Sequence, residues 1–280
     1  MIRETKTSAD HGSFRTITIS ALLMMLLSVL ALFASVYGIF NEAVYHELLI
    51  TGAITESLIL GSIVQDMISI PASLFLIAAS VIYIRKNDRK MLIIMLGLTA
   101  YIFYGYALYT IQGQYTSIYL VYLVILSLSV YSMIFGMVEL LSDIEHIFLP
   151  KPVRYFITVF TFLILLVLIP AWIGIMTPDI IRRSPGEIYG VFVLDLAIIF
   201  PALAIIAFKV LKGDGKGYLL SGVAIVKIFT LCLSVALGEW LKPIYGFPKD
   251  WSMILVFSVL TAVSAMIGVL YFARIDIKRS

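Results

Sequence analysis

The sequence predicts an all-α protein: a polytopic membrane bundle of eight transmembrane helices, arranged as two parallel four-helix repeats. Of the 280 residues, 61% are hydrophobic and 13% are charged, whereas a soluble domain has about 45–50% apolar and about 25% charged residues. A soluble globule of this length has too little interior to hide that much apolar surface. The composition therefore excludes an ordinary soluble enzyme, and the single cysteine excludes a disulfide scaffold.

Eight apolar segments are long enough to cross a bilayer, because a helix rises about 1.5 Å per residue and the hydrocarbon layer is roughly 30 Å thick. They are too continuously apolar for barrel strands, in which hydrophobic and polar residues alternate. In chain order the predicted spans are Ile17–Phe40, Leu58–Ile84, Met91–Thr110, Ser117–Val138, Tyr155–Met176, Val191–Val210, Gly217–Leu237 and Ser252–Ala273. The predicted parts are a cytoplasmic segment 1–16, a first half 17–138, a cytoplasmic connection 139–154, a second half 155–273 and a cytoplasmic tail 274–280.

Lys and Arg residues in the connections predict the orientation, since cytoplasmic loops carry an excess of them. With both termini in the cytoplasm, fifteen of the 20 Lys and Arg residues lie on that side, four lie outside and Lys227 lies within a span. We therefore expect both termini to be cytoplasmic. The net charge of +3 is too small to indicate a nucleic-acid partner.

An internal repeat relates the second span to the sixth. Gly61 to Asp66 is followed by Pro71, and Gly190 to Asp195 is followed by Pro201. Each of these spans ends in a Lys-x-Asp-x-Lys loop, at 86–90 and at 212–216. Parallel repeats with a binding site between them recur in transporters. The alternative is that Gly, Asp and Pro recur by chance in apolar helices.

These motifs also carry a resemblance. Gln65-Asp66 followed by Pro71, and Asp195 followed by Pro201, Gly217-Tyr218-Leu219 and Lys227, resemble a family of prokaryotic multi-pass integral membrane proteins to which no activity is attached. The resemblance covers short motifs within 61–109 and 193–227. It implies a bacterial or archaeal plasma membrane and no mechanism.

Three ionisable residues, Asp66, Asp195 and Lys227, lie inside the predicted spans. Each costs about 2.5–3.5 kcal/mol at the bilayer centre on insertion scales, so such residues pair or face a polar cavity. We expect them to converge on one substrate or ion site in the outer half of the bilayer. Gln65 and Tyr101 join the candidates, since Gln65 precedes Asp66 and Tyr101 aligns with Lys227 between the two repeats. The alternative is that the charges only fix helix packing.

Two other features have simpler interpretations. We expect a cluster of tyrosines around the third and fourth spans to form an outer interfacial belt, because Tyr favours that depth; an aromatic cage for a cation is the alternative. The cluster comprises Tyr101, Tyr104, Tyr106, Tyr109, Tyr115, Tyr119 and Tyr122, of which Tyr101 alone stands apart as the candidate for the site. Glu42, His46 and Glu47 are close in sequence, but the three histidines of the chain are scattered, and we expect no metal and no cofactor.

The first functional hypothesis is a small secondary transporter that moves a small solute or a proton. A second is an intramembrane enzyme acting on a lipid or prenyl substrate, although the sequence lacks the motifs His-Glu-x-x-His and Gly-x-Ser-x-Gly. A third is a structural or regulatory membrane subunit. An enzyme is the less favoured class, and the bilayer is the expected partner in all three.

Overall fold

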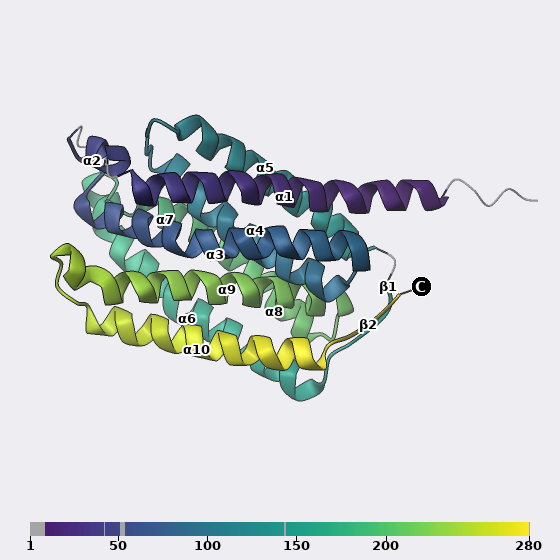
Figure 1. The fold of residues 1–280 in the computed structure, drawn as a ribbon. Coiled ribbons are helices and arrows are strands. Elements are labelled where there is room, and N and C mark those ends of the chain that lie inside the picture. The colour runs from purple at the N-terminus through teal and green to yellow at the C-terminus, as the bar shows by residue number, and fades with distance from the viewer. Residues whose placement is uncertain (1–8, 42, 51–53, 143, 280) are drawn as a thin grey trace, which may run out of the picture.

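The computed structural model describes residues 9–41, 43–50, 54–142 and 144–279. The helices of its first half are α1 (Ala9–Phe40), α2 (Ala43–Ile50), α3 (Glu56–Lys86), α4 (Arg89–Ile111) and α5 (Tyr119–Leu140). Strand β1 (Ile144–Phe148) leads to α6 (Lys151–Arg182), α7 (Tyr189–Leu194), the π turn η1 (Asp195–Ile199) and α8 (Phe200–Leu211). The chain ends with α9 (Gly215–Leu241), the 3-10 turn η2 (Lys242–Tyr245), α10 (Trp251–Arg274) and strand β2 (Asp276–Arg279). Figure 1 shows the long helices packed side by side.

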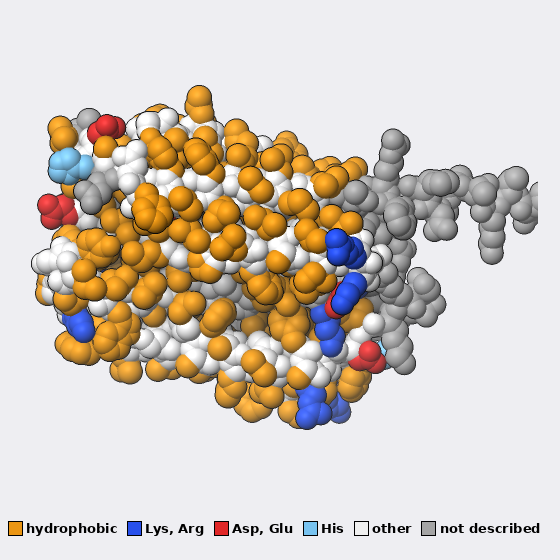
Figure 2. Space-filling view, in the orientation of Figure 1, with side chains coloured by type: hydrophobic (Ala, Val, Ile, Leu, Met, Phe, Trp, Pro, Cys, Tyr) orange, Lys and Arg blue, Asp and Glu red, His pale blue; other side chains and the backbone are white. Residues whose placement is uncertain are grey.

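The predicted fold class is confirmed. Within the described residues, 8 helical segments are long and apolar enough to cross a membrane, and they coincide with the predicted spans to within a few residues, except that the fifth and seventh extend further. Their outer faces are apolar: Leu166 and Val269, for example, are each 71% exposed. Figure 2 shows this apolar band, with charged side chains gathered at its two ends. The chain is a multi-pass membrane protein.

The two ends of the bundle differ. One end, here called the α2 end, carries α2 and the connections 112–118, 183–188 and 242–250. The other, the sheet end, carries the antiparallel pair β1–β2, in which Phe148 lies opposite Asp276 (Figure 1). The predicted connection 139–154 and tail 274–280 thus supply strands. Of the predicted segment 1–16, residues 1–8 lie outside the described residues and the rest begins α1.

The helices of each half pack in the same order. In the first half, α1 and α4 each contact both α3 and α5; in the second half, α6 and α9 each contact both α8 and α10. The halves meet where α9 contacts α4 and α3. Gly97 of α4 permits this approach, since a Cβ there would lie 2.4 Å from the Cβ of Val226 and 3.0 Å from the carbonyl oxygen of Val223.

The two Lys-x-Asp-x-Lys loops have the same local structure. Asn87 and Gly213 adopt left-handed backbone conformations with φ of 50° and 81°. Each is followed by an aspartate that caps the next helix: Asp88 accepts from the backbone N–H of Lys90, and Asp214 from that of Lys216, both at 2.9 Å. A left-handed residue followed by an N-cap is a compact way to reverse a helix.

The π turn η1 accounts for a difference between the repeats. The N–H of Phe200 bonds the carbonyl of Asp195, five residues back, and Pro201 offers no N–H. A π turn adds one residue to a helix. The spacing from Asp195 to Pro201 is accordingly one residue longer than the spacing from Asp66 to Pro71.

Candidate functional site

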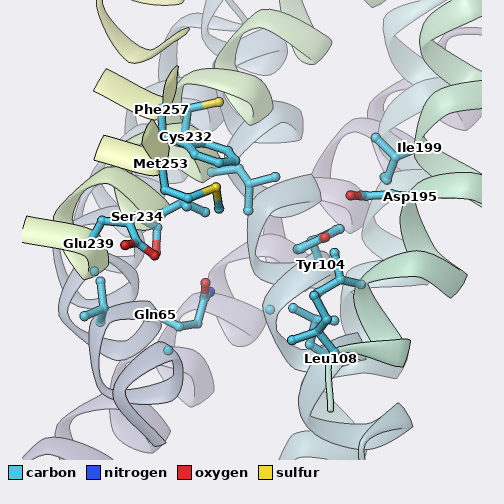
Figure 3. Close-up of a pocket in the computed structure, with 18 of the residues that line it drawn as sticks. Gln65, Tyr104, Leu108, Asp195, Ile199, Cys232, Ser234, Glu239, Met253 and Phe257 are labelled. Atoms are coloured by element: carbon cyan, nitrogen blue, oxygen red, sulfur yellow. The ribbon is translucent and has the colours of Figure 1, made fainter. Parts of the chain in front are cut away.

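A cavity of about 340 Å³ lies in the half of the bundle nearest the α2 end. It lies between α3, α4, α6, α7–α8, α9 and α10, so residues of both halves line it. Most of its wall is aliphatic or aromatic, with a few polar groups. In Figure 3, Asp195 and Tyr104 lie on one wall, and Gln65, Ser234 and Glu239 lie on the opposite wall. Ligand sites in proteins have this size and this mixture of an apolar wall and few polar groups.

Asp195 is held in place by aromatic side chains. It is 5% exposed and begins the π turn η1. Its carboxylate accepts a hydrogen bond of 2.7 Å from the indole N–H of Trp172, on α6. The Tyr104 hydroxyl, on α4, interacts with the same carboxylate (Figure 3). The carboxylate is therefore oriented by donors from two other helices.

Lys227 lies near Asp195 without bonding it. Its ammonium lies 4.4 Å from the centre of the Tyr104 ring, in a cation–π contact. The charges of Lys227 and Asp195 interact, but among the described residues no ion pair within 4.0 Å and no hydrogen bond from the ammonium involves Lys227. The side chain is 5% exposed and lines the cavity. A buried ammonium without acceptors is costly.

The opposite wall carries amides and hydroxyls. The Gln65 amide N–H donates to the Ser69 hydroxyl at 3.3 Å, and Gly105 of α4 leaves the room that this side chain occupies. Nearer the α2 end, the hydroxyl of Ser62 donates to the Gln114 side chain at 3.3 Å. These groups offer hydrogen bonds to a ligand but no charge.

Near the α2 end, an ion pair lies in the lining of the cavity. Glu239, at the end of α9, lies 2.7 Å from the ammonium of Lys242, and both line the cavity. The pair is partly exposed. It belongs to the same end of the bundle as Gln112 and Ile188, which also line the cavity.

Asp66 does not share this cavity. It is 2% exposed and accepts hydrogen bonds from the hydroxyls of Tyr45, on α2, and Tyr109, on α4. The cavity is lined by its neighbour Gln65 and not by Asp66. The expectation that Asp66, Asp195 and Lys227 converge is therefore wrong for Asp66, because successive residues of a helix point about 100° apart.

Tyr101 lies behind the cavity wall. It is 0% exposed, and its hydroxyl donates to the backbone carbonyl of Gln65 at 3.4 Å. It connects α4 to the helix that carries both Gln65 and Asp66. Tyr101 does not line the cavity.

The predicted tyrosine belt is wrong for most of its members. Five of the seven tyrosines are buried, whereas Tyr115 is exposed and Tyr119 is half-buried. The buried five are Tyr101, Tyr104, Tyr106, Tyr109 and Tyr122. The hydroxyls of four of them, Tyr101, Tyr104, Tyr106 and Tyr109, find partners inside the bundle, which lowers the cost of burial. Within the described residues they surround no cation as a cage would, and of the five Tyr104 contacts Lys227.

Sequence reasoning missed Trp172, Tyr104 and Glu239 as site residues. Trp172 offered a signal, since an indole N–H inside an apolar span needs an acceptor. Glu239 lay beyond the predicted end of the seventh span at Leu237, whereas α9 continues to Leu241. Tyr104 could not be separated from the neighbouring tyrosines without knowing which helix faces it.

No group of three or more His, Cys, Asp or Glu side chains that could hold a metal ion occurs among the described residues. Of the three outer residues considered for a metal, Glu42 lies outside the described residues, and His46 and Glu47 are exposed. No family model, no curated protein and no solved structure matches the chain.

Proposed function

We propose that the protein is a small secondary transporter that binds its solute in the cavity between the two halves. The observation that carries this proposal is Lys227, a buried ammonium that faces the cavity and has no acceptor in the part of the chain that the structure describes, beside the oriented carboxylate of Asp195. A ligand group with acceptor oxygens would satisfy the ammonium. Intramembrane charges facing a cavity commonly mark a substrate or ion pathway.

The arrangement of helices supports movement of one half against the other. The two halves have the same packing order and the same capped loops, as two parallel repeats would. In transporters built from repeats, alternating access is a rocking of one repeat against the other around a fixed site. Here that site is the cavity lined by α3 and α4 from one half and by α6, α7–α8, α9 and α10 from the other.

The docking alternative is less favoured by the geometry. A structural role for Asp195 and Lys227 rests on an ion pair that joins two helices. The described residues contain three ion pairs within 4.0 Å, and none joins these two. A purely structural role also gives no reason for a cavity beside Asp195 and Lys227, because protein interiors are close-packed.

The single cysteine of the chain offers a direct test. Cys232 lines the cavity, so a membrane-impermeant methanethiosulfonate reagent reports when the cavity is open to water. In membrane vesicles of either orientation, a transporter exposes Cys232 to both sides in turn, and we expect labelling from both. Labelling from the α2 end alone, with none from the sheet end, would refute transport and leave a one-sided binding protein.

A matched control separates opening of the cavity from loosening of the whole bundle. Cys232→Ser removes the reactive thiol. Thr99→Cys in that background places a thiol at a position that is 0% exposed and does not line the cavity. This control should stay unlabelled from both sides. An enzyme would also differ from a transporter in returning its substrate chemically changed.

We propose further that the membrane is the plasma membrane of a prokaryote and that the sheet end, with both termini, is cytoplasmic. The excess of Lys and Arg at that end supports the orientation, following the positive-inside rule. The prokaryotic plasma membrane is what the resemblance of the motifs around Asp66 and Asp195 implies. A reporter that fluoresces only in the cytoplasm, fused after the C-terminus, tests the orientation. A dark fusion that is nevertheless expressed at full length would reverse it.

A further inference from the structure

The polar groups of the cavity are unequally satisfied. Asp195 already accepts from Trp172 and interacts with Tyr104. Lys227 has a ring face and no acceptor among the described residues. An ammonium carries three donors. The unmet demand in the cavity is therefore for acceptor oxygens on the ligand, placed at Lys227, and not for a cation at Asp195.

Charge balance restricts the ligand further. With Lys227 protonated and Asp195 ionised, the two charges at the inner part of the cavity cancel. Bringing a monoanion to Lys227 leaves one uncompensated negative charge in a region of low dielectric, which is unfavourable. One proton bound to the Asp195 carboxylate restores neutrality and leaves the ligand and Lys227 as a pair.

The remainder of the wall is apolar. Ile199, Leu231 and Phe257 line the cavity around the charged groups, together with other aliphatic side chains. Such a wall favours a hydrocarbon portion of the ligand, because burial of apolar surface gains about 25 cal/mol per Å². A small, fully hydrated inorganic anion would gain nothing from it.

We infer that the substrate of this site is an amphipathic organic monoanion, whose charged group pairs with Lys227 and which enters together with one proton carried on Asp195. That this ligand is a transported substrate rests on the proposed function. The chemical class of the ligand rests on the cavity alone. In the bound state the proton has moved from water to a carboxylate oxygen of Asp195. The ligand anion has replaced the Asp195 carboxylate as the counter-charge of Lys227. No bond of the ligand breaks.

The groups that face Asp195 are few. Lys227 and Cys232 approach from α9 and Tyr104 from α4, while α6 contributes the neutral indole of Trp172. Asp66 does not line the cavity and is hydrogen-bonded by Tyr45 and by Tyr109, of which Tyr109 lines the cavity. A pH dependence of binding that disappears in Asp195→Asn is therefore assigned to Asp195, and that variant keeps Lys227 and Tyr104 in place.

Protection of Cys232 from N-ethylmaleimide measures occupancy in detergent solution. The probe is hexane-1-sulfonate, which stays ionised at all working pH values. The matched probes are ethanesulfonate, with the same charge and little hydrocarbon, and hexyltrimethylammonium, with the same chain and the opposite charge. We expect hexane-1-sulfonate to slow labelling by about 5-fold or more at a concentration where the other two change it by less than about 2-fold.

Variants at the two charged residues test the roles separately. Lys227→Met should abolish protection. In the wild type, apparent affinity should rise as pH falls, by up to about 10-fold per unit if one proton accompanies the anion, and Asp195→Asn should bind with little pH dependence. If Lys227→Met does not fold, the comparison of the three probes on the wild type decides. Protection by the cation, equal protection by ethanesulfonate, or a reactive Cys232 that no sulfonate protects would each overturn the inference.

The outcome is distinguishable from that of the proposed function. Protection by hexane-1-sulfonate with labelling from the α2 end alone would keep the ligand class and refute transport. Labelling of Cys232 from both sides without protection by any sulfonate would keep transport and refute the ligand class.

Discussion

Replacing Gly97 by alanine tests the junction between the two halves. Gly97 lies on α4 where α9 comes closest, and a Cβ at this position would lie 2.4 Å from the Cβ and 2.6 Å from the Cγ1 of Val226. Carbon atoms in contact normally stand about 3.5–4.0 Å apart. The Cβ of Val226 is fixed to its backbone, so a change of rotamer cannot relieve the contact. The two helices must separate by about 1 Å at this level.

The expected magnitude combines two opposing effects. In a helix, alanine is more favourable than glycine by about 0.5–1 kcal/mol. Overpacking of a well-packed interior costs typically about 1–3 kcal/mol. We therefore expect Gly97→Ala to lower the free energy of unfolding by about 1–2 kcal/mol. Unfolding by sodium dodecyl sulfate in mixed micelles, followed by far-ultraviolet circular dichroism, measures it.

Gly174→Ala is the matched control. Gly174 lies within α6, and nothing stands within 4 Å of the place where its Cβ would lie. The same substitution should there raise stability by up to about 1 kcal/mol. If Gly97→Ala were as stable as Gly174→Ala, α4 and α9 would not pack as closely as the structure shows, and the boundary between the halves would lie elsewhere.

Three further substitutions test polar contacts outside the cavity. Tyr45→Phe removes a hydroxyl donor from the buried carboxyl of Asp66 and should cost about 1–3 kcal/mol in the same unfolding assay; an unchanged protein would mean that α2 is not held by this bond. Glu139→Gln replaces the acceptor of two buried hydroxyl donors, Ser20 and Tyr83, and should also destabilise the protein by about 1–3 kcal/mol. An unchanged stability would show that these two hydroxyls tolerate a neutral amide. The hydrogen bond from Lys209 holds the pKa of Asp214 below its usual value, so its contribution is present above the unfolded pKa of about 4 and is lost as the pH falls through the lower folded value. Because this pair is partly exposed, its effect on the free energy of unfolding is under about 1 kcal/mol. The free energy of unfolding should therefore rise slightly between pH about 3 and about 6 in the wild type and lose this pH dependence in Asp214→Asn. A pH dependence kept by the variant would assign it to another group.

Much of the membrane architecture could be predicted from the sequence because it depends on local properties. Span positions follow from the length of apolar runs, and the chain reversals at Asp88 and Asp214 follow from capping residues. Helix α2 could not be predicted, since eight residues between two spans carry too weak a pattern to distinguish a helix from a loop. The strands were missed for a different reason, because β1 and β2 are held by pairing between residues far apart in the chain.

The candidate site was predicted in part. Asp195, Lys227 and Gln65 line one cavity as expected. Asp66 and Tyr101 do not, because the rotation of each helix about its axis is set by packing against neighbours and is not readable from one apolar sequence. The same rotation turns inward four tyrosines that were expected at the membrane interface, Tyr104, Tyr106, Tyr109 and Tyr122.

By itself, the amino-acid order determined that this chain spans a membrane eight times and that it carries ionisable groups within the spans. Both statements concern the exchange of water for hydrocarbon, which each segment undergoes on its own. Only the tertiary structure decided which of those groups meet. Whether Lys227 faces Asp195 across an open space, while Asp66 is enclosed by Tyr45 and Tyr109, depends on how helices distant in the chain rotate and pack against one another.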